Sequence, residues 1–478
     1  MTSMPKSRSE ASDRYPVDRL ITALAASNLP WATARLVRLL ITRVSITANS
    51  QYASTKASRR VLLLPRRGFT DDIITTLSTI PSLDVIALKR RRLKAISSAF
   101  LPKEIDDNNY VVNSSSTKAA MRAYRDFLCQ FWQALDPSGR INAVLSGNFG
   151  YYAEQEFAAA LESLGVPFIA LHKENSWSPG NQSFWEAVYR ERRAPFRGRR
   201  ILVYSPIERD LQLRAGVVDR DRIEVTGMPR LDVVHRWRQS NVGLVPKPTV
   251  LFASFLPEVG MPFLSKTTQA PSSGCSLADQ EVSRTMSLTT LCRSVHRAIL
   301  KLAIENPNMT ILIKTKGRER DRMGLVKLLG IAEDGDLPAN AQVIHGGSPL
   351  PAIAQASVVC GLHSTLLLEA LAAGRPVVVP WYAEALNPEI SRYLFDLGPA
   401  VLRAASADEF VERVRSVALA QAPVPATLPS ETQKFLREWV GNDDGKASER
   451  AAAAILRTIE AAASALGSLG RARAALPS

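Results

Sequence analysis

The residues best placed to do chemistry stand in the stretch 356–380, where a polar set follows an apolar run. Gly361 allows a tight turn, and Ser364 and Thr365 open the helix predicted after it. A helix N-terminus offers free N–H groups and a positive dipole end to an anion. Glu369 lies four residues after Thr365, so it shares that helix face and is suited to accept from two sugar hydroxyls. The set predicts a bound nucleotide, with phosphate at the helix start and ribose at Glu369.

Two lysines end another predicted strand, at 309–314. Lys314 and Lys316 are two residues apart, so both project from one face if the strand persists. At the carboxyl rim of a parallel sheet their charges would meet a diphosphate, because ligands of such sheets bind beyond the strand ends. An ordinary solvated strand end is the alternative.

Three stretches resemble motifs of known families. Residues 361–378 resemble the donor-nucleotide motif of GT-B glycosyltransferases. Residues 225–232 resemble the TG-x-PR-x-D signature of CDP-glycerol glycerophosphotransferase-like proteins, surface-carbohydrate (capsule) biosynthesis proteins and UDP-sugar 2-epimerases. Residues 170–175 are similar to the HKE step of the surface-carbohydrate group. Together the stretches cover about residues 140–380, in the order expected of the two-domain fold.

This resemblance implies two Rossmann-like parallel-sheet domains that face across a cleft, the GT-B arrangement, with a C-terminal helix returning to the first domain. It implies a glycosyltransferase of cell-surface polysaccharide biosynthesis, which moves a sugar from a nucleotide-activated donor to a glycan or lipid-linked acceptor. In similar families the backbone at the strand end near His345 approaches the base of the donor. Gly227 suits a tight turn. Arg230 suits bidentate hydrogen bonding to a phosphate or carboxylate, and a structural Arg–Asp pair is the alternative.

The HKE step places three ionisable residues, His172, Lys173 and Glu174, directly after a predicted strand. Side chains alternate along an extended chain, so His172 and Glu174 share a side and Lys173 points the other way. A transferase needs a base near the acceptor hydroxyl, and either His172 or Glu174 is suited to that task. We assign Glu174 as the base and His172 to binding of acceptor or donor phosphate, with a salt-linked loop start as the alternative.

Other functions stay open. The same families offer a CDP-glycerol-type glycerophosphotransferase or a UDP-sugar 2-epimerase-like enzyme. They carry K-P-H-P where this sequence has Lys314-Thr-Lys-Gly317, and that histidine is functional in the glycerophosphotransferases. Its absence favours sugar transfer. A basic, non-catalytic protein that binds nucleic acid or a membrane is a further alternative.

The elements that must position these residues alternate between apolar runs and helical patterns, which predicts βαβ units and two parallel sheets in an α/β fold. We expect four parts, in this order: a disordered start with a basic amphipathic helix and a linker, 1–58; an N-terminal Rossmann-like acceptor domain, 59–241; a C-terminal Rossmann-like nucleotide-donor domain, 249–425; and a C-terminal helical segment, 426–478.

The charge of +15, with 60 Lys and Arg against 45 Asp and Glu, favours anionic partners such as nucleotides. Residues 17–46 are predicted to be helical, with arginines among the apolar residues. Such a helix lies on the inner membrane surface or packs on the first domain with its arginines in water. Strands lack interleaved aromatic and basic residues, so no nucleic-acid partner is expected.

Apolar runs fall short of the roughly 18 residues that a membrane-spanning helix needs, and the first 14 residues lack the apolar core of a signal peptide. We therefore expect a cytoplasmic protein, with membrane association as an option. The four cysteines show no CxxC spacing, and no cluster of His, Asp and Cys has metal-ligand spacing. A nucleotide sugar is expected as substrate, without a metal or cofactor.

Overall fold

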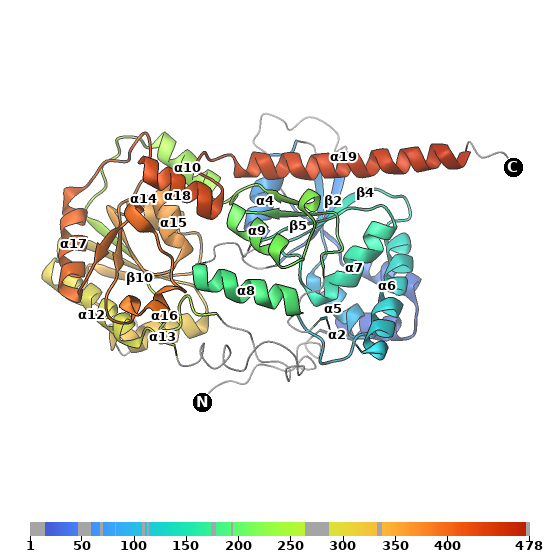
Figure 1. The fold of residues 1–478 in the computed structure, drawn as a ribbon, viewed down its shortest axis with the longest axis horizontal. Coiled ribbons are helices and arrows are strands. Elements are labelled where there is room, and N and C mark those ends of the chain that lie inside the picture. The colour runs from blue at the N-terminus through green and yellow to red at the C-terminus, as the bar shows by residue number, and fades with distance from the viewer. Residues whose placement is uncertain are drawn as a thin grey trace.

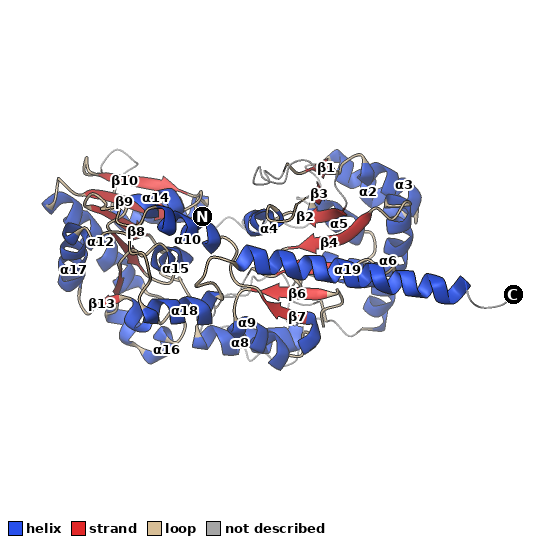
Figure 2. Cartoon of the chain, turned by 90° about the horizontal axis from the view of Figure 1, so that it is seen from above, coloured by secondary structure: helices blue, strands red, loops and turns tan. Residues whose placement is uncertain are grey.

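Two α/β domains lie side by side, one built on each of two sheets (Figure 1, Figure 2). The computed structural model describes residues 15–45, 59–66, 70–81, 83–107, 110–111, 114–173, 178–192, 195–262, 286–331 and 337–474. None of the helices in these ranges is both long enough and apolar enough to cross a membrane.

The first sheet has the order β1-β3-β2-β4-β5-β6-β7, parallel except for the edge strand β1. Its strands are β1 (Thr42–Arg43), β2 (Arg59–Leu64), β3 (Leu83–Ala87), β4 (Ile141–Ser146), β5 (Phe168–Leu171), β6 (Arg200–Val203) and β7 (Ile223–Val225). The helices are α2 (Pro16–Ala26), α3 (Pro30–Arg38), α4 (Thr70–Leu77), α5 (Arg90–Ser97), α6 (Ser115–Leu135), α7 (Tyr152–Ser163), α8 (Pro179–Arg192), α9 (Pro206–Arg214), η2 (Arg220–Arg222) and α10 (Leu231–Ser240). The strand order reverses between β2 and β4.

The second sheet is parallel throughout, in the order β10-β9-β8-β11-β12-β13. Its strands are β8 (Thr249–Ala253), β9 (Thr310–Thr315), β10 (Ala341–His345), β11 (Val358–Gly361), β12 (Val377–Pro380) and β13 (Leu402–Ala404). The helices are α12 (Thr289–Glu305), α13 (Glu319–Leu329), α14 (Leu350–Gln355), α15 (Thr365–Ala372), η3 (Ala383–Leu386), α16 (Pro388–Ser391), η4 (Gly398–Ala400), α17 (Ala407–Ala420), α18 (Ser430–Val440) and α19 (Ala447–Ala474). This strand order is that of a Rossmann sheet, with its reversal between β8 and β11. The predicted fold class, two Rossmann-like domains in a GT-B arrangement, is confirmed.

The prediction of a single helix over 17–46 is wrong. The chain forms α2 and α3, separated by Asn28 at φ +52° and restarted by Pro30 at the first position of α3. Proline is tolerated there because its missing N–H has no partner in the first helical turn. Both helices pack on the first domain and bury Ile21 and Val37. The linker predicted at 47–58 lies outside the described residues.

The C-terminal helix α19 returns along the first domain, as the resemblance implied (Figure 2). Ala451, Ile455 and Ile459 join the apolar cluster on one face of the first sheet, together with Val61 and Leu145. Residues four apart lie on the same side of a helix, so α19 presents one apolar stripe to the strands. The last long helix therefore completes a core that begins with β2.

The chain passes between the domains twice, and the two passages lie against each other. The N–H of Met228 donates to the carbonyl of Val440 at 2.9 Å. Gly227 has φ +90°, and a Cβ there would come 2.4 Å from the carbonyl oxygen of Gly441. Only glycine allows this approach, so Gly227 serves the packing of the two passages. The helix after the first passage, α10, already packs on α15 of the second domain, ahead of the domain boundary expected between 241 and 249.

One buried carboxylate joins the two passages. Oδ1 of Asp232 accepts from Nδ2 of Asn442 at 2.7 Å and from the N–H of Ala447 at 3.0 Å, and Oδ2 accepts from the N–H of Ser448 at 2.7 Å. Asp232 thus caps the start of α19 from the start of α10. A negative group at a helix N-terminus is favoured by the helix dipole and by the unpaired N–H groups there.

Asp232→Asn is expected to lower the stability of the protein by about 2 kcal/mol, because one buried N–H then faces an amide instead of a carboxylate oxygen. Urea unfolding followed by helix circular dichroism measures the effect. The matched control is Asp219→Asn, since Asp219 is 82% exposed and caps nothing with its side chain. Equal unfolding midpoints for the two variants would contradict the role of Asp232.

Candidate functional site

The strand reversal of the second sheet is shaped by a glycine. Gly361 ends β11 with φ +148°, and a Cβ there would meet the side chain and carbonyl of Ala253, at the end of β8, at 2.8 Å. Any other residue would push β8 and β11 apart at the place where open α/β sheets bind ligands. The hydroxyl of Ser364 then accepts from the N–H of Leu366 at 3.3 Å and caps α15. The predicted turn and helix start are both present, with Thr365 as the first helical residue.

Glu369 lies in α15 and is 6% exposed. Its closest charged contact is Arg230 of the opposite domain, with Nε 3.8 Å from Oε1. That distance is longer than a hydrogen bond, and the carboxylate makes no side-chain hydrogen bond with a described residue. A buried carboxylate in this state retains its accepting capacity for a ligand.

The lysines predicted for a diphosphate differ in their surroundings. Lys314 is buried within β9, and its ammonium group donates to the carbonyl of Gly346. Lys316 follows the strand and is exposed. His345 ends the neighbouring strand β10, with Nδ1 3.0 Å from the hydroxyl of Thr315. All of these groups stand at the carboxyl rim of the second sheet.

Charged groups of both domains meet around Arg230. Nη1 of Arg230 lies 4.0 Å from Oδ2 of Asp72, which is in the first turn of α4, while Nε faces Glu369. The same Oδ2 accepts from the hydroxyl of Tyr204, and Oδ1 of Asp72 is buried without a hydrogen-bond partner among the described residues. Arg230 therefore lies between a carboxylate of its own domain and one of the second domain, whereas Asp232 of the same motif caps α19. This arrangement differs from an Arg–Asp pair within the motif.

Burial shifts the proton affinities of this cluster. It raises the pKa of Glu369 to about 7, although Arg230 opposes the shift. Burial lowers the pKa of Lys314, against the attraction of Glu369. The pKa of Lys173 is also lowered, by burial first and by Arg230 next, while Asp72 acts in the opposite direction. Lys173 thus contributes its charge to the interface between the domains.

His172 does not lie at the rim where it was expected. Its side chain is 1% exposed, and Nε2 lies 3.0 Å from Oε1 of Glu208 in α9. The N–H of His172 donates to the carbonyl of Leu202 and continues the pairing of β5 with β6. The alternation of an extended chain then turns His172 into the first domain and Lys173 toward the second. Direct binding of acceptor or donor phosphate by His172 is not supported by this position. Glu174 lies outside the described residues.

Two further residues at the site were missed from sequence. Asp72 carried a usable signal, because it stands in the first turn of the helix after β2, at the strand reversal of the first sheet. His363 lies inside the recognised motif and has φ +44°, which is uncommon for a residue other than glycine. Its Nδ1 accepts from the N–H of Phe395 at 3.1 Å, and its ring stacks on Phe395 with centroids 3.9 Å apart. Burial lowers the pKa of His363 to about 3, so the ring stays neutral beside Lys316.

In the part of the chain that the structure describes, no three His, Cys, Asp or Glu side chains gather in a way that could hold a metal ion. The positive groups around Glu369 include Lys314, Lys173 and Arg230, with Lys316 at the end of β9 and the start of α15 at the same rim. Such groups can stabilise a departing diphosphate electrostatically.

No protein-family model and no curated protein matches this chain. Among solved structures, it is similar to a variant of the wall teichoic acid polymerase TagF, at 10% identity over 93% of this chain and 98% of that chain, with a TM-score of 0.46. It is also similar to the UDP-GlcNAc 2-epimerase from Methanocaldococcus jannaschii, at 11% identity over 84% and 99%, with a TM-score of 0.45. A third similar structure, the glycotransferase of kitacinnamycin, is 16% identical over 84% and 98%, with a TM-score of 0.42.

Glu369→Gln is expected to remove a pH dependence of stability. The pKa of Glu369 is about 7 in the folded protein and 4.5 ordinarily, so between these values the folded protein holds a proton that the unfolded chain has lost. The free energy of unfolding of the wild type therefore falls as the pH rises through this window, by up to about 3 kcal/mol. Glutamine does not titrate, so the variant gains stability relative to the wild type between about pH 5 and pH 8.

Urea unfolding of both proteins at several pH values measures this difference, in which the titrations of all other groups cancel. Glu389→Gln is the control, because the Glu389 side chain is 71% exposed. A difference between Glu369→Gln and wild type that stays constant across the window would refute the raised pKa.

Proposed function

We propose that this protein is a glycosyltransferase of cell-surface polysaccharide biosynthesis, with a nucleotide-activated sugar as donor and a glycan or lipid-linked acceptor. One observation carries the proposal: Glu369, a buried carboxylate that makes no hydrogen bond with a described residue, stands beside Lys314 and the capped start of α15. Ribose hydroxyls satisfy such a carboxylate, and phosphates satisfy the lysine and the helix start. The strand reversal between β8 and β11 is the place where a Rossmann sheet takes a nucleotide.

The first domain supplies the acceptor side in this proposal. Arg230 and Lys173 bring positive charge to the interface, where the diphosphate leaves, and oriented charges in a dry site stabilise it well. Glu174 remains the proposed base, next to Lys173 in sequence. His172 becomes a positioning residue, because its Nε2, 3.0 Å from Oε1 of Glu208, holds the end of β5 against α9.

Contact with an anionic membrane surface is part of the proposal, on the cytoplasmic side. Trp31 and Leu39 are 60% and 82% exposed, at the start of α3 and just beyond its end. Arg35, four residues after Trp31, lies on the same side of α3, whereas the guanidinium of Arg38 donates to the carbonyls of Ala134 and Leu135 at the end of α6. Exposed aromatic and aliphatic side chains beside an arginine suit the interface of an anionic bilayer.

A UDP-sugar 2-epimerase-like enzyme is the nearest alternative, because it uses the same nucleotide site without an acceptor. Product formed from a nucleotide sugar in the absence of any acceptor would favour it. The glycerophosphotransferase alternative is weakened by Lys316 at the place of the functional histidine of that family.

A panel of UDP-, CDP-, GDP- and CMP-activated compounds is expected to contain one that stabilises the protein. At about one hundred times its dissociation constant, a ligand adds about 2.7 kcal/mol to the free energy of unfolding. Glu369→Gln is expected to weaken the binding of that ligand by about 1.5–3 kcal/mol, since a charged hydrogen-bond acceptor is lost. Titration calorimetry measures both proteins, with Glu389→Gln as the control. Unchanged affinity in a folded Glu369→Gln protein would exclude Glu369 from the site.

Glu174→Gln is expected to lower turnover by about 10²–10⁴ and to leave donor affinity unchanged, because the nucleotide binds in the other domain. The comparison variant is Asp72→Asn, which neutralises a carboxylate in the first turn of α4 that faces Arg230. Steady-state transfer and calorimetric donor binding are measured for both. Normal turnover in Glu174→Gln with a loss in Asp72→Asn would assign the base to Asp72 instead.

A further inference from the structure

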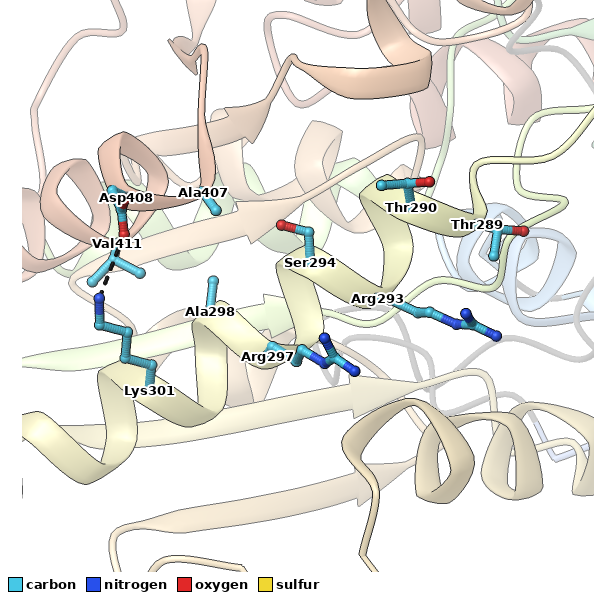
Figure 3. Close-up of a pocket in the computed structure, with 10 residues that line it drawn as sticks. All are labelled: Thr289, Thr290, Arg293, Ser294, Arg297, Ala298, Lys301, Ala407, Asp408 and Val411. Carbon is cyan, nitrogen blue, oxygen red and sulfur yellow. Dashed lines mark hydrogen bonds and ion pairs between the residues drawn. The ribbon is translucent and has the colours of Figure 1, made fainter.

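A pocket of about 500 Å³ lies between α12 and α17 (Figure 3). In Figure 1 these two helices stand on the flank of the second domain that faces away from the first. The volume is that of an ordinary ligand site. The pocket is separate from the cluster around Glu369, and the proposed donor site does not use it.

Three cations of α12 line this pocket: Arg293, Arg297 and Lys301. They follow one another at four residues, so they lie on one face of the helix and span about 12 Å along its axis. The opposite face, with Val295 and Ile299, is buried in the core of the second domain. The helix therefore holds its three charges at fixed positions along the pocket.

This charge is costly, and ion pairs within the described part of the chain neutralise little of it. Like charges four residues apart destabilise a helix, and α12 carries two such pairs in succession. On α17, by contrast, Arg413 pairs with Glu409 and Arg415 with Glu412. Neither Arg293 nor Arg297 makes an ion pair with any residue in the described part of the chain. An external anion would relieve the repulsion.

Lys301 is the exception, with Nζ 3.4 Å from Oδ1 of Asp408. The Asp408 side chain is 92% exposed, so water and salt screen this pair and an incoming anion can displace it. The pocket thus presents two guanidinium groups that make no ion pair with a described residue and one weakly held ammonium group.

The lining side chains indicate which anion fits. Guanidinium forks match carboxylate and phosphate groups, and the hydroxyls of Thr290 and Ser294 in the same pocket suit sugar hydroxyls. The lining residues include no aromatic ring on which a nucleic-acid base would stack. A concave site also fits a flat lipid surface poorly.

We propose that this pocket binds an acidic saccharide segment, whose carboxylate or phosphate groups pair with Arg293 and Arg297. That the segment belongs to the acceptor or product glycan rests on the proposed function; the anion site itself does not. Glu384, which follows β12, accepts from the N–H groups of Thr290 and Leu291 at 2.7 and 2.8 Å. The end of the pocket at Thr290 therefore lies against the segment that follows β12, on the side of the second sheet where its strands end.

The test uses the full-length protein and a fluorescent oligogalacturonate of about ten sugars, at about 0.15 M salt. Arg293→Ala/Arg297→Ala is expected to weaken binding at least about tenfold, since charged hydrogen bonds are lost at two positions. The control Arg220→Ala/Arg236→Ala removes two exposed arginines outside the pocket, and we expect a change below about twofold because distant charges are screened. An uncharged dextran oligomer is expected not to bind.

A second variant separates a specific site from diffuse attraction. Arg293→Lys/Arg297→Lys retains the charge but lacks the planar forks, and a loss of several-fold is expected. Full affinity in this variant, equal losses in the alanine pair and its control, or no binding by the wild type would overturn the proposal. The proposal would also be overturned if the wild type bound single-stranded DNA or anionic vesicles more tightly than the oligogalacturonate, and if the alanine pair abolished that binding.

Tripolyphosphate competition decides between the two anionic groups: displacement of the oligogalacturonate supports a site for either group, and its failure supports a carboxylate site. Donor binding is measured in the same variants and is expected to match the wild type. Oligogalacturonate binding without any response to nucleotide sugars would retain the pocket and reject the proposed function.

Discussion

The contact between the two chain passages is the constraint on which the rest of the structure depends. Asp232 begins α10, which packs on the second domain, and it caps α19, which covers the first sheet. A single buried carboxylate thus fixes helices that belong to opposite halves of the molecule. Gly227 allows the passages to approach to within backbone contact, so both residues of the recognised motif have a structural reason to be there. Arg230 stands between them and takes its position from this contact.

The position of Arg230 in turn organises the charges at the interface. Arg230 faces Asp72 on one side and Glu369 on the other, at distances of 4.0 and 3.8 Å. Buried charges are expensive, and a pair at this distance recovers only part of the cost of desolvation. The raised pKa of Glu369 reflects the part of the desolvation cost that Arg230 does not recover. A ligand that donates hydrogen bonds to the carboxylate would offset this remaining cost, and this connects the electrostatics of the interface with nucleotide binding.

The positive charge of the chain is used in two ways. Many surface arginines pair with a carboxylate one helical turn away, as on α17. Lys314 and Lys316 at the rim of the second sheet, and Arg293 and Arg297 on α12, make no such pair with a described residue. Both sets of cations are held by rigid elements. One set stands at strand ends, and the other lies on one face of a helix. Rigid placement reduces the entropy lost on binding, so these are the places where an anionic substrate would gain most.

The sequence alone determined the features that depend on residues close to each other along the chain. Apolar alternation and helical spacing predicted the parallel strands and the fold class, and Gly361 with Ser364 predicted the turn and cap before α15. The break between α2 and α3 was also marked locally, by Pro30, although a single helix was expected. Tertiary structure decided which side of β5 faces the partner domain, and so turned His172 inward and Lys173 outward. It also decided the partners of Asp232 and Arg230, which lie more than 100 residues away in sequence. Local patterns reflect backbone geometry and hydrogen bonding within a few residues, whereas these pairings depend on how two domains close on each other.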